Sequence, residues 1–443
     1  MTDQLIANVE AALPRTLVDL KALVAIPSVS SQPEHDEDVQ ASAEQVAAWL
    51  RELGCPEVNI VREGGQPAVI GSFPAPDGQP TVCLYAHHDV QPTGDPAGWT
   101  TPPFEASERD GRLWGRGSSD DKGGVAAHLA VLRAFDGHPP IGVRLFIEGE
   151  EEIGSPSLAN ILEAHHDELE ADVFIIADSG NWDTGYPAIT ATLRGVTDCV
   201  VEVSTLDHGL HSGEYGGVLP DALTCLCRLI ATLHDDKGNV AIEGLVRSQA
   251  PDVDYPLDRL DKESGKLDGV EWIGDGTVVE RIWNGPSVSV LAIDTTRIAD
   301  ASNTLIPSAS AKVSIRLAPG EDAEHAADLL EQHLLTHAPW GAHVKVTKGA
   351  AGQPSVIPLD GPGIQAAIAA MKQVWGIDPV MMGMGGSIPM ITDFQNAFPG
   401  AEVVVTAVAD PASRAHSLDE SLGLDDWGKA AQAEALLIQA LAR

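Results

Sequence analysis

The chain has 443 residues, of which 44% are hydrophobic, and this length and composition are typical of a globular protein with more than one domain. Its 65 acidic residues outnumber its 27 basic residues, and the net charge of -38 argues against binding to nucleic acid or to a membrane surface. No segment reaches the roughly 18 consecutive apolar residues of a membrane span.

The cysteines and the N-terminal segment indicate a cytoplasmic location. The five cysteines are odd in number and scattered along the chain, which predicts buried thiols rather than a disulfide framework. Residues 1–30 are acidic and amphipathic, and they lack the basic start and apolar run of a signal peptide. We therefore expect the protein in the cytoplasm.

The first 190 residues alternate between helical and strand patterns. Apolar periodicity predicts helices at 3–24, 38–53, 125–135 and 156–166, and strands at 81–86, 143–148 and 172–177. Pro14 is expected to interrupt the first of these helices. Such alternation predicts a mostly parallel or mixed sheet flanked by helices.

After about residue 190 the pattern changes. Strands are predicted at 199–205, 287–293, 309–318 and 343–349, and helices at 221–234 and 323–337. The resulting order βαββαβ is typical of the ferredoxin-like arrangement. The polar segment 236–285 is interpreted as an elaboration of this part of the chain.

The first pattern then resumes, with predicted helices at 363–376 and 428–443 and a strand at 403–408. The second region therefore interrupts the first. We expect an α/β domain with a mixed sheet and helices on both faces, formed by residues 1–190 and 354–443, and an inserted ferredoxin-like α+β domain at 191–353.

Histidines and carboxylates follow several predicted strands. His87, Glu152 and Asp178 come at or just after strand ends, Asp120 lies in the glycine-rich segment GRGSSDDKG, and His416 follows the last strand. Each alone has an ordinary explanation, as a surface histidine, a turn former or a solvated helix start. Together they suit a hydrolase with two metal ions about 3.5–4 Å apart and one bridging carboxylate.

These residues lie in motifs that together resemble a known family. The motifs are YAHHDVQP (85–92), GRGSSDDKG (115–123), EGEEEIGS (148–155), IADSGNW (176–182), HSGEYGG (211–217), IRLAPG (315–320), GGSIP (385–389) and RAHS (414–417). The combination resembles the M20 family of di-zinc metallopeptidases, and its dipeptidase branch with the carnosinase-like enzymes in particular. The resemblance spans nearly the whole chain and implies a catalytic α/β domain with an inserted lid domain.

The resemblance implies a role for each residue of the centre. His87 and Asp178 would bind one metal ion, Glu152 and His416 would bind the other, and Asp120 would bridge them. Asp89 would orient His87. Glu151 would act as the general base. The ions are expected to be zinc, with manganese or cobalt also compatible with these donors.

The neighbours of these residues are expected to be less important. Glu150 and His88 occupy positions that vary in the family, so Glu150 is interpreted as a solvated side chain and His88 as a non-ligand. The family also tends to have a cis peptide bond between the two aspartates that correspond to Asp120 and Asp121.

The resemblance further implies a substrate site in the inserted domain. His211 would stabilise the tetrahedral oxyanion, in some members across a dimer, and Arg316 would bind the free carboxylate of a small peptide substrate. Thr304, Gly386 and Ser387 resemble further contacts on the carboxylate side. A homodimer through the lid domain is expected from the family.

The residues and the resemblance are compatible with three functions. Asp at position 178 is typical of family members that act on dipeptides, whereas Glu is typical of carboxypeptidases and deacylases. A dipeptidase or related exopeptidase is therefore favoured over an N-acyl amino acid amidase or deacylase. A catalytically silent binding protein is disfavoured because every predicted ligand and the base are present.

Overall fold

The computed structural model describes residues 2–386 and 389–442. The chain divides into two compact units. The first contains residues 1–191, 357–382 and 390–443, and the second contains residues 192–356 and 383–389. None of the described helices is long and apolar enough to cross a membrane.

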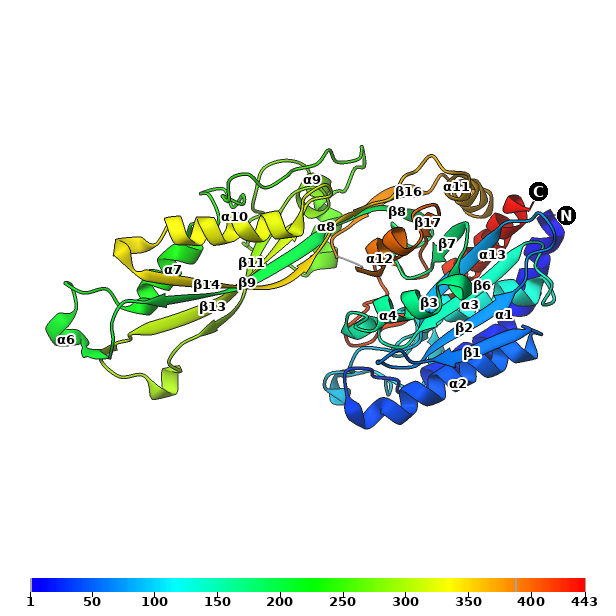
Figure 1. Cartoon of the computed structure of the whole chain (residues 1–443), viewed down its shortest axis with the longest axis horizontal. Coiled ribbons are helices and arrows are strands. Elements are labelled where there is room, and N and C mark those ends of the chain that lie inside the picture. Colours follow the sequence, from blue (N-terminus) through cyan, green and yellow to red (C-terminus); the bar gives the residue numbers. More distant parts are fainter. Residues whose placement is uncertain (1, 387–388, 443) are drawn as a thin grey trace. The chain divides into compact units, whose positions relative to one another are not determined.

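The first unit is built on a six-stranded sheet with the order β1-β2-β6-β3-β7-β17. Strands β6, β3, β7 and β17 are parallel, and β2 and β1 add antiparallel pairs at one edge (Figure 1). The strands of this unit are β1 Glu57–Val61, β2 Ala68–Phe73, β3 Thr81–His87, β4 Ser107–Arg109, β5 Arg112–Trp114, β6 Gly142–Glu148, β7 Val173–Ile176, β17 Glu402–Val405 and β18 Ser421–Gly423. This confirms the predicted α/β architecture with a mixed sheet.

The helices of the first unit cover this sheet. They are α1 Thr2–Val24, α2 Asp36–Glu52, α3 Lys122–Ala134, α4 Leu158–Ala164, α5 His166–Leu169, α11 Pro362–Trp375, α12 Pro389–Ala397 and α13 Leu424–Leu441. Nearly every residue of β3, β6 and β7 is buried, which requires cover on both faces of these parallel strands. Phe394 of α12 contacts the rings of Phe174, Phe146 and Tyr85.

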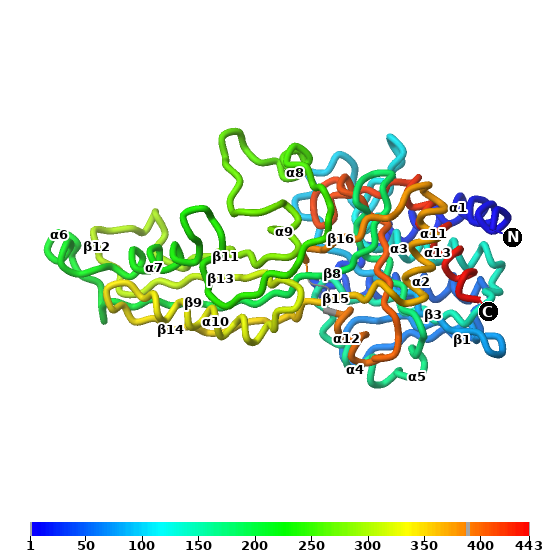
Figure 2. The backbone as a smooth tube through the Cα atoms, turned by 90° about the horizontal axis from the view of Figure 1, so that it is seen from above, coloured from blue at the N-terminus to red at the C-terminus, as the bar shows by residue number. Residues whose placement is uncertain are grey.

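The first and last helices pack together, so both ends of the described chain lie in the first unit (Figure 2). Helix α1 is continuous, and the predicted interruption at Pro14 is wrong. Pro14 and Glu10 both lie on the exposed side of the helix, so the carbonyl group of Glu10, which lacks the usual amide partner, can bond to water. Strands β1 and β2 were not predicted, because their short apolar runs lack a clear period of two.

The second unit contains a four-stranded antiparallel sheet with the order β11-β13-β9-β14. Its elements are β9 Gly195–Ser204, β10 Leu210–His211, α6 Ser212–Tyr215, α7 Ala222–Ala231, α8 Leu257–Ser264, α9 Val278–Ile282, β11 Ser287–Asp294, β12 Thr304–Leu305, β13 Ser308–Leu317, α10 Ala323–Thr336 and β14 His343–Gly352. Alternate residues of β13 are buried, as expected for a strand with helices on one face only. Helices α7 and α10 supply that cover through a shared apolar core, and α10 runs along the sheet in Figures 1 and 2.

Three short strands lie where the chain passes between the units. They are β8 Ala188–Leu193, β15 Ser355–Val356 and β16 Val380–Met384, and they pair in the order β15-β8-β16. Short 3-10 helices occur at Pro33–His35, Pro96–Gly98, Glu151–Ile153, Ile298–Asp300 and Pro339–Gly341.

Candidate metal centre

The predicted histidines and carboxylates of the first unit lie together at the carboxyl ends of the parallel strands of the six-stranded sheet. His87 is the last residue of β3, Asp178 follows β7 by two residues, and Glu151 and Glu152 lie in the 3-10 turn after β6. His416 lies between β17 and β18. Because β3, β6, β7 and β17 are parallel, their carboxyl ends share one edge of the sheet, where side chains from distant segments converge.

His87 presents one ring nitrogen to the cluster. Its Nδ1 atom lies 3.1 Å from the main-chain oxygen of Asp89 and 3.3 Å from the Asp89 carboxylate, so this nitrogen carries a proton and donates it. Its Nε2 atom lies 3.1 Å from Asp120 Oδ1 and 3.9 Å from both Asp178 Oδ2 and Glu151 Oε2. In the neutral imidazole, Nε2 therefore has a lone pair available for a metal ion.

His416 lies on the other side of Asp120. Its Nε2 atom is 2.9 Å from Asp120 Oδ2 and 3.2 Å from Glu152 Oε2. Its side chain is 59% exposed, and its φ of 62° is in the left-handed region. Asp120 therefore directs one carboxylate oxygen to each histidine, which is the arrangement that a bridging carboxylate requires.

The cluster concentrates negative charge in a buried place. Burial raises the pKa of Asp178 to about 7, with Asp120 and Glu152 adding to the effect and His87 opposing it. Burial is also the largest cause that raises the pKa of Glu151 to about 9. Hydrogen bonds to Asp120 and Glu152 raise the pKa of His416 to about 10. Burial alone would raise the pKa of Asp120, but its bonds with His416 and His87 hold it below the ordinary value.

The raised pKa values of Asp178, Glu151 and His416 mean that these side chains bind protons more readily than usual, at positions where a cation could bind instead. Two groups of three donor atoms lie close together, one from His87, Glu151 and Asp178 and the other from His87, Asp120 and Glu152. Within each group the three atoms lie within 4.8 Å of one another. Imidazole nitrogens and carboxylate oxygens are donors that suit zinc, manganese or cobalt. A divalent ion would displace the protons and compensate the carboxylates, so the residues present fit a metal centre.

The segment around Asp89 orders both glutamates of the cluster. Its carboxylate accepts hydrogen bonds from the main-chain N–H groups of Glu151 at 3.3 Å and Glu152 at 3.2 Å. Gln91, which was not predicted from the sequence, donates from its side chain to Glu152 Oε2 at 2.7 Å and from its main chain to Oε1 at 3.1 Å. The only feature of the sequence that could have indicated Gln91 is its position close to the predicted residues His87 and Asp89.

The interpretation of Glu150 as a solvated side chain is wrong. Glu150 is buried, and it accepts hydrogen bonds from the main-chain N–H groups of Gln66 at 2.9 Å and Ser157 at 2.6 Å. It ties the turn that carries the next two glutamates to the rest of the unit. His88 points away from the cluster, with Nε2 2.9 Å from the main-chain oxygen of Pro67. The Asp120–Asp121 peptide bond is cis, as the resemblance implies.

The other predicted site residues belong to the second unit. His211 and Thr304 face each other in the short pair β10 and β12. Arg316, on β13, is paired in register with Ser287, and it lies close enough to Arg194 to contribute to lowering the pKa of that side chain, for which burial is the main cause. A Cβ atom added at Gly386 would meet no described atom within 4 Å, its chain neighbours aside. Ser387 lies outside the described residues.

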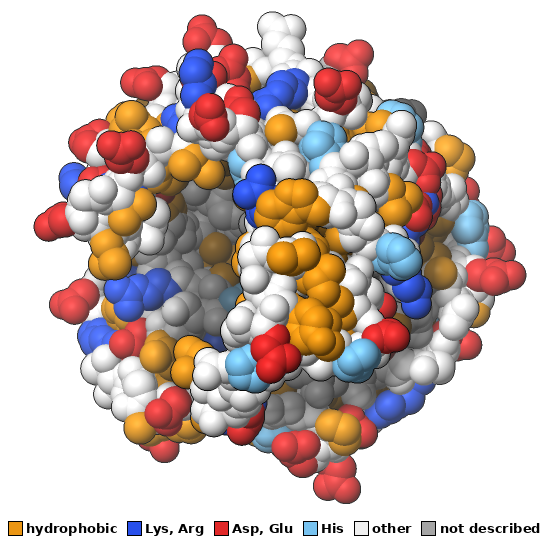
Figure 3. Space-filling model, turned by 90° about the vertical axis from the view of Figure 1, so that its left-hand side faces the viewer, with side chains coloured by type: hydrophobic (Ala, Val, Ile, Leu, Met, Phe, Trp, Pro, Cys, Tyr) orange, Lys and Arg blue, Asp and Glu red, His pale blue; other side chains and the backbone are white. Residues whose placement is uncertain are grey.

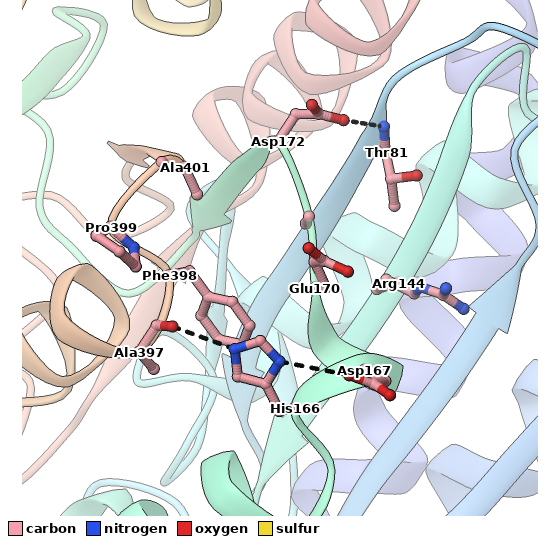
Figure 4. Close-up of a pocket in the computed structure, with 12 residues that line it drawn as sticks. Thr81, Arg144, His166, Asp167, Glu170, Asp172, Ala397, Phe398, Pro399 and Ala401 are labelled. Atoms are coloured by element: carbon pink, nitrogen blue, oxygen red, sulfur yellow. Dashed lines mark hydrogen bonds and ion pairs between the residues drawn. The ribbon is translucent and has the colours of Figure 1, made fainter.

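A cavity of about 540 Å³ lies in the first unit at the amino end of strand β3, the end opposite the metal centre. Thr81, the first residue of β3, contributes to its lining, whereas His87 is the last residue of the same strand. In Figure 4, Asp172 accepts a bond from the Thr81 main chain, and His166 lies against Phe398 and near the Ala397 carbonyl. The cavity is therefore separate from the metal centre.

Comparison with known proteins places the chain in a family. The model of peptidase family M20/M25/M40 matches residues 83–440. A cysteinylglycine-S-conjugate dipeptidase from Corynebacterium striatum is 34% identical and aligns with 95% of this chain and 94% of its own length. A Beta-Ala-His dipeptidase from Rattus norvegicus is 30% identical, over 85% of this chain and 83% of its own. The crystal structure of human carnosine dipeptidase 1 has a TM-score of 0.83 at 25% identity, covering 100% of this chain and 98% of that one.

The family match extends over the segments that carry His87, Asp120, Glu152, Asp178 and His416. The arrangement of these residues at the carboxyl ends of parallel strands and the similarity along the chain lead to the same conclusion: the protein is a member of peptidase family M20/M25/M40.

Proposed function

We propose that this peptidase is a dipeptidase that uses two divalent metal ions, with His87 and Asp178 binding one ion, Glu152 and His416 binding the other, and Asp120 bridging them. The observation that carries the proposal is the position of Asp120, with one oxygen 3.1 Å from His87 Nε2 and the other 2.9 Å from His416 Nε2. Such ions, of which zinc is the first candidate, supply Lewis-acid polarisation of the scissile carbonyl and activation of a water molecule.

Within this proposal, Glu151 is the general base that takes a proton from water and gives it to the leaving amine. Two observations support this choice over Glu152. The Glu151 side chain is 21% exposed, whereas that of Glu152 is 3% exposed and is held by Gln91. The raised pKa of Glu151 also suits a group that must hold a proton, and cations nearby would bring that pKa down toward neutrality.

The second unit is proposed to be a ferredoxin-like lid that completes the substrate site. Its strand order β11-β13-β9-β14 and its helices α7 and α10 support this description. His211 would stabilise the oxyanion, and Arg316, with Thr304, Gly386 and Ser387, would bind the substrate carboxylate. Arg316 suits this role because a guanidinium group forms paired hydrogen bonds with a carboxylate.

The enzyme is proposed to form a homodimer through the second unit. Strand β11 is an edge of its sheet, and Val290, Leu291 and Ile293 on this strand are exposed. An exposed apolar edge strand is a common surface for pairing with a second chain. A cytoplasmic location is proposed as well, and the five cysteines, which form no disulfide, are consistent with it.

The substrate class is tested with a panel of free dipeptides, including Cys-Gly and β-Ala-His, measured against N-acetyl and N-succinyl amino acids. We expect kcat/KM to be higher for the dipeptides, because the named relatives are dipeptidases. A preference for the acylated amino acids would replace the dipeptidase with the deacylase. Absence of turnover on both sets by the metal-loaded protein would favour a binding protein.

A further inference from the structure

The loop that carries Asp120 and the loop that carries His416 are joined by one buried ion pair. Arg116 and Glu420 are almost completely buried, and Arg116 Nη1 lies 2.7 Å from Glu420 Oε2. Neither residue is among the ligands proposed above. Their positions along the chain are significant: Arg116 precedes Asp120 by four residues, and Glu420 follows His416 by four residues.

Glu420 organises the main chain of the Asp120 loop. Its Oε2 atom also accepts a hydrogen bond from the main-chain N–H of Gly117 at 2.9 Å. Its Oε1 atom accepts bonds from the N–H groups of Ser119 at 2.9 Å and Asp120 at 3.1 Å, and from the Ser119 hydroxyl at 3.0 Å. One carboxylate thus holds three main-chain amides that lead to the proposed bridging ligand.

Arg116 adds a second contact to the His416 loop and a contact to one further loop. Its Nη2 atom donates to the main-chain oxygens of Ser417, next to His416, and Pro92, next to Gln91, both at 3.2 Å. Gln91 in turn bonds Glu152. The guanidinium group of the Asp120 loop therefore contacts two other segments, one that carries His416 and one that carries Gln91, the partner of Glu152.

The His416 loop needs such support. Arg414, His416 and Asp419 all have positive φ values, and a non-glycine residue in that region persists only where the surrounding structure holds it. The imidazole itself is more than half exposed, so packing around the ring does little to place it. After His416, the loop is held by Glu420 and by the Asp419 carboxylate, which accepts hydrogen bonds from the main-chain N–H and the hydroxyl of Thr100.

We infer that Glu420 and Arg116 are positioning residues of the metal centre, which set the separation of Asp120 from His416 by joining the two loops through one buried ion pair. The inference rests on the proposed function, because it takes Asp120 and His416 as metal ligands. Loss of the ion pair should weaken binding of the ion held by Glu152 and His416 more than the ion held by His87 and Asp178. Residues that orient metal ligands typically affect metal affinity by about 10–100-fold.

The test is a titration of the full-length, metal-stripped protein with Co²⁺, followed by calorimetry and by the visible spectrum of the bound cobalt. For Glu420→Gln, we expect one of two binding events to weaken about 10–100-fold and the spectrum of that site to change. The control is Glu434→Gln, which replaces another buried glutamate of the same unit, bonded to His128 and away from the ligand loops. It should lower the unfolding temperature but keep both affinities.

A second variant covers the case in which Glu420→Gln does not fold. Arg116→Lys keeps the charge beside Glu420 and leaves the Asp120 loop bonds in place, but a lysine cannot reach Ser417 and Pro92 together. It too should weaken one binding event. Unchanged affinity for both ions in the folded variants would overturn the inference while leaving the proposed function intact. If the wild-type protein bound no Co²⁺, the proposed function would fail and the inference with it.

Discussion

At the scale of single residues, adjacent side chains of one type have different environments. Three glutamates follow one another in sequence at positions 150–152. Glu150 is buried and accepts hydrogen bonds from main-chain N–H groups, and Glu152 accepts a hydrogen bond from the Gln91 side chain. Glu151 is partly exposed and faces the cluster. The chemistry available to a carboxylate depends on such neighbours, which decide its charge and its reach.

Replacing Glu151 by Gln tests the proposed base. The variant should retain both metal ions, because the proposed ligands are untouched, and should lose about 10²–10⁴ in kcat on a dipeptide. Metal content by elemental analysis and steady-state kinetics check the two parts. Glu152→Gln is the matched comparison, and it should lower metal affinity as well. Nearly normal turnover in Glu151→Gln would exclude this glutamate as the base.

Replacing His416 by Ala tests the proposed second ion. The imidazole contacts Asp120 and Glu152, so its removal leaves one site with carboxylates alone. We expect the purified variant to hold one metal equivalent fewer than the wild type. His138→Ala, at an exposed histidine outside the cluster, should keep the full content. If His416→Ala also keeps the full content, His416 is not a ligand.

At the scale of elements, strand β3 is anchored to helix α3 beneath it. His128 of α3 donates from Nε2 to the main-chain oxygen of Tyr85 at 3.0 Å, and its Nδ1 lies 2.9 Å from the Glu434 carboxylate on α13. Since both acceptors lack protons to give, both ring nitrogens carry them and the imidazole is charged. Burial alone would lower the pKa of His128, but Glu434 raises it above the ordinary value.

This pair makes stability depend on pH in a defined direction. The pKa of His128 is higher in the folded state than the value of about 6.5 expected in the unfolded state. The pair of His128 with Glu434 therefore contributes its full stabilisation only below about pH 6.5. The contribution is lost as the pH rises through the folded-state pKa. His128→Leu should therefore cost about 3–5 kcal/mol near pH 6 and less at higher pH.

Urea unfolding of His128→Leu and the wild type from pH 6 upward measures this difference. His138→Leu, at the exposed histidine, provides the control and should show a difference near zero at every pH. A cost that stays constant or grows with pH would show that His128 is neutral in the folded protein.

At the scale of the whole molecule, acidic side chains are spread over the visible surface rather than gathered in one patch (Figure 3). The net charge of -38 is consistent with this distribution and with a surface that repels polyanions. The proposed dimer therefore needs an apolar contact to overcome repulsion between two acidic chains.

The exposed edge strand β11 is the surface proposed for that contact. Leu291, which is 59% exposed, should be buried when two chains pair, so Leu291→Glu should shift the protein from dimer to monomer in sedimentation velocity. Val18→Glu adds the same charge at a 58% exposed position of α1 in the first unit and should leave the dimer intact. A wild type that sediments as a monomer would remove the dimer from the proposal.

Much of the fold was predictable from the sequence for identifiable reasons. Residues 82–86 and 145–147 are continuous apolar runs within the strands predicted at 81–86 and 143–148, and helix 323–337 has a clear apolar period. Strands β1 and β2 were missed because their apolar runs are short. The continuity of α1 past Pro14 could not be read from the residue type, since the outcome depends on which side of the helix faces solvent.

The sequence by itself determined that His87, Glu152 and Asp178 come at or just after predicted strands, that Asp120 lies in a glycine-rich segment and that His416 follows the last predicted strand, and the motifs around these residues indicated the family. Only the tertiary structure decided that Asp120 lies between two histidines, that Glu150 is buried, and that Glu420 and Arg116 join the loops of the proposed ligands Asp120 and His416. The reason is physical. A hydrogen bond between segments some 300 residues apart depends on where the chain brings them, and neither segment carries a local pattern that specifies the other.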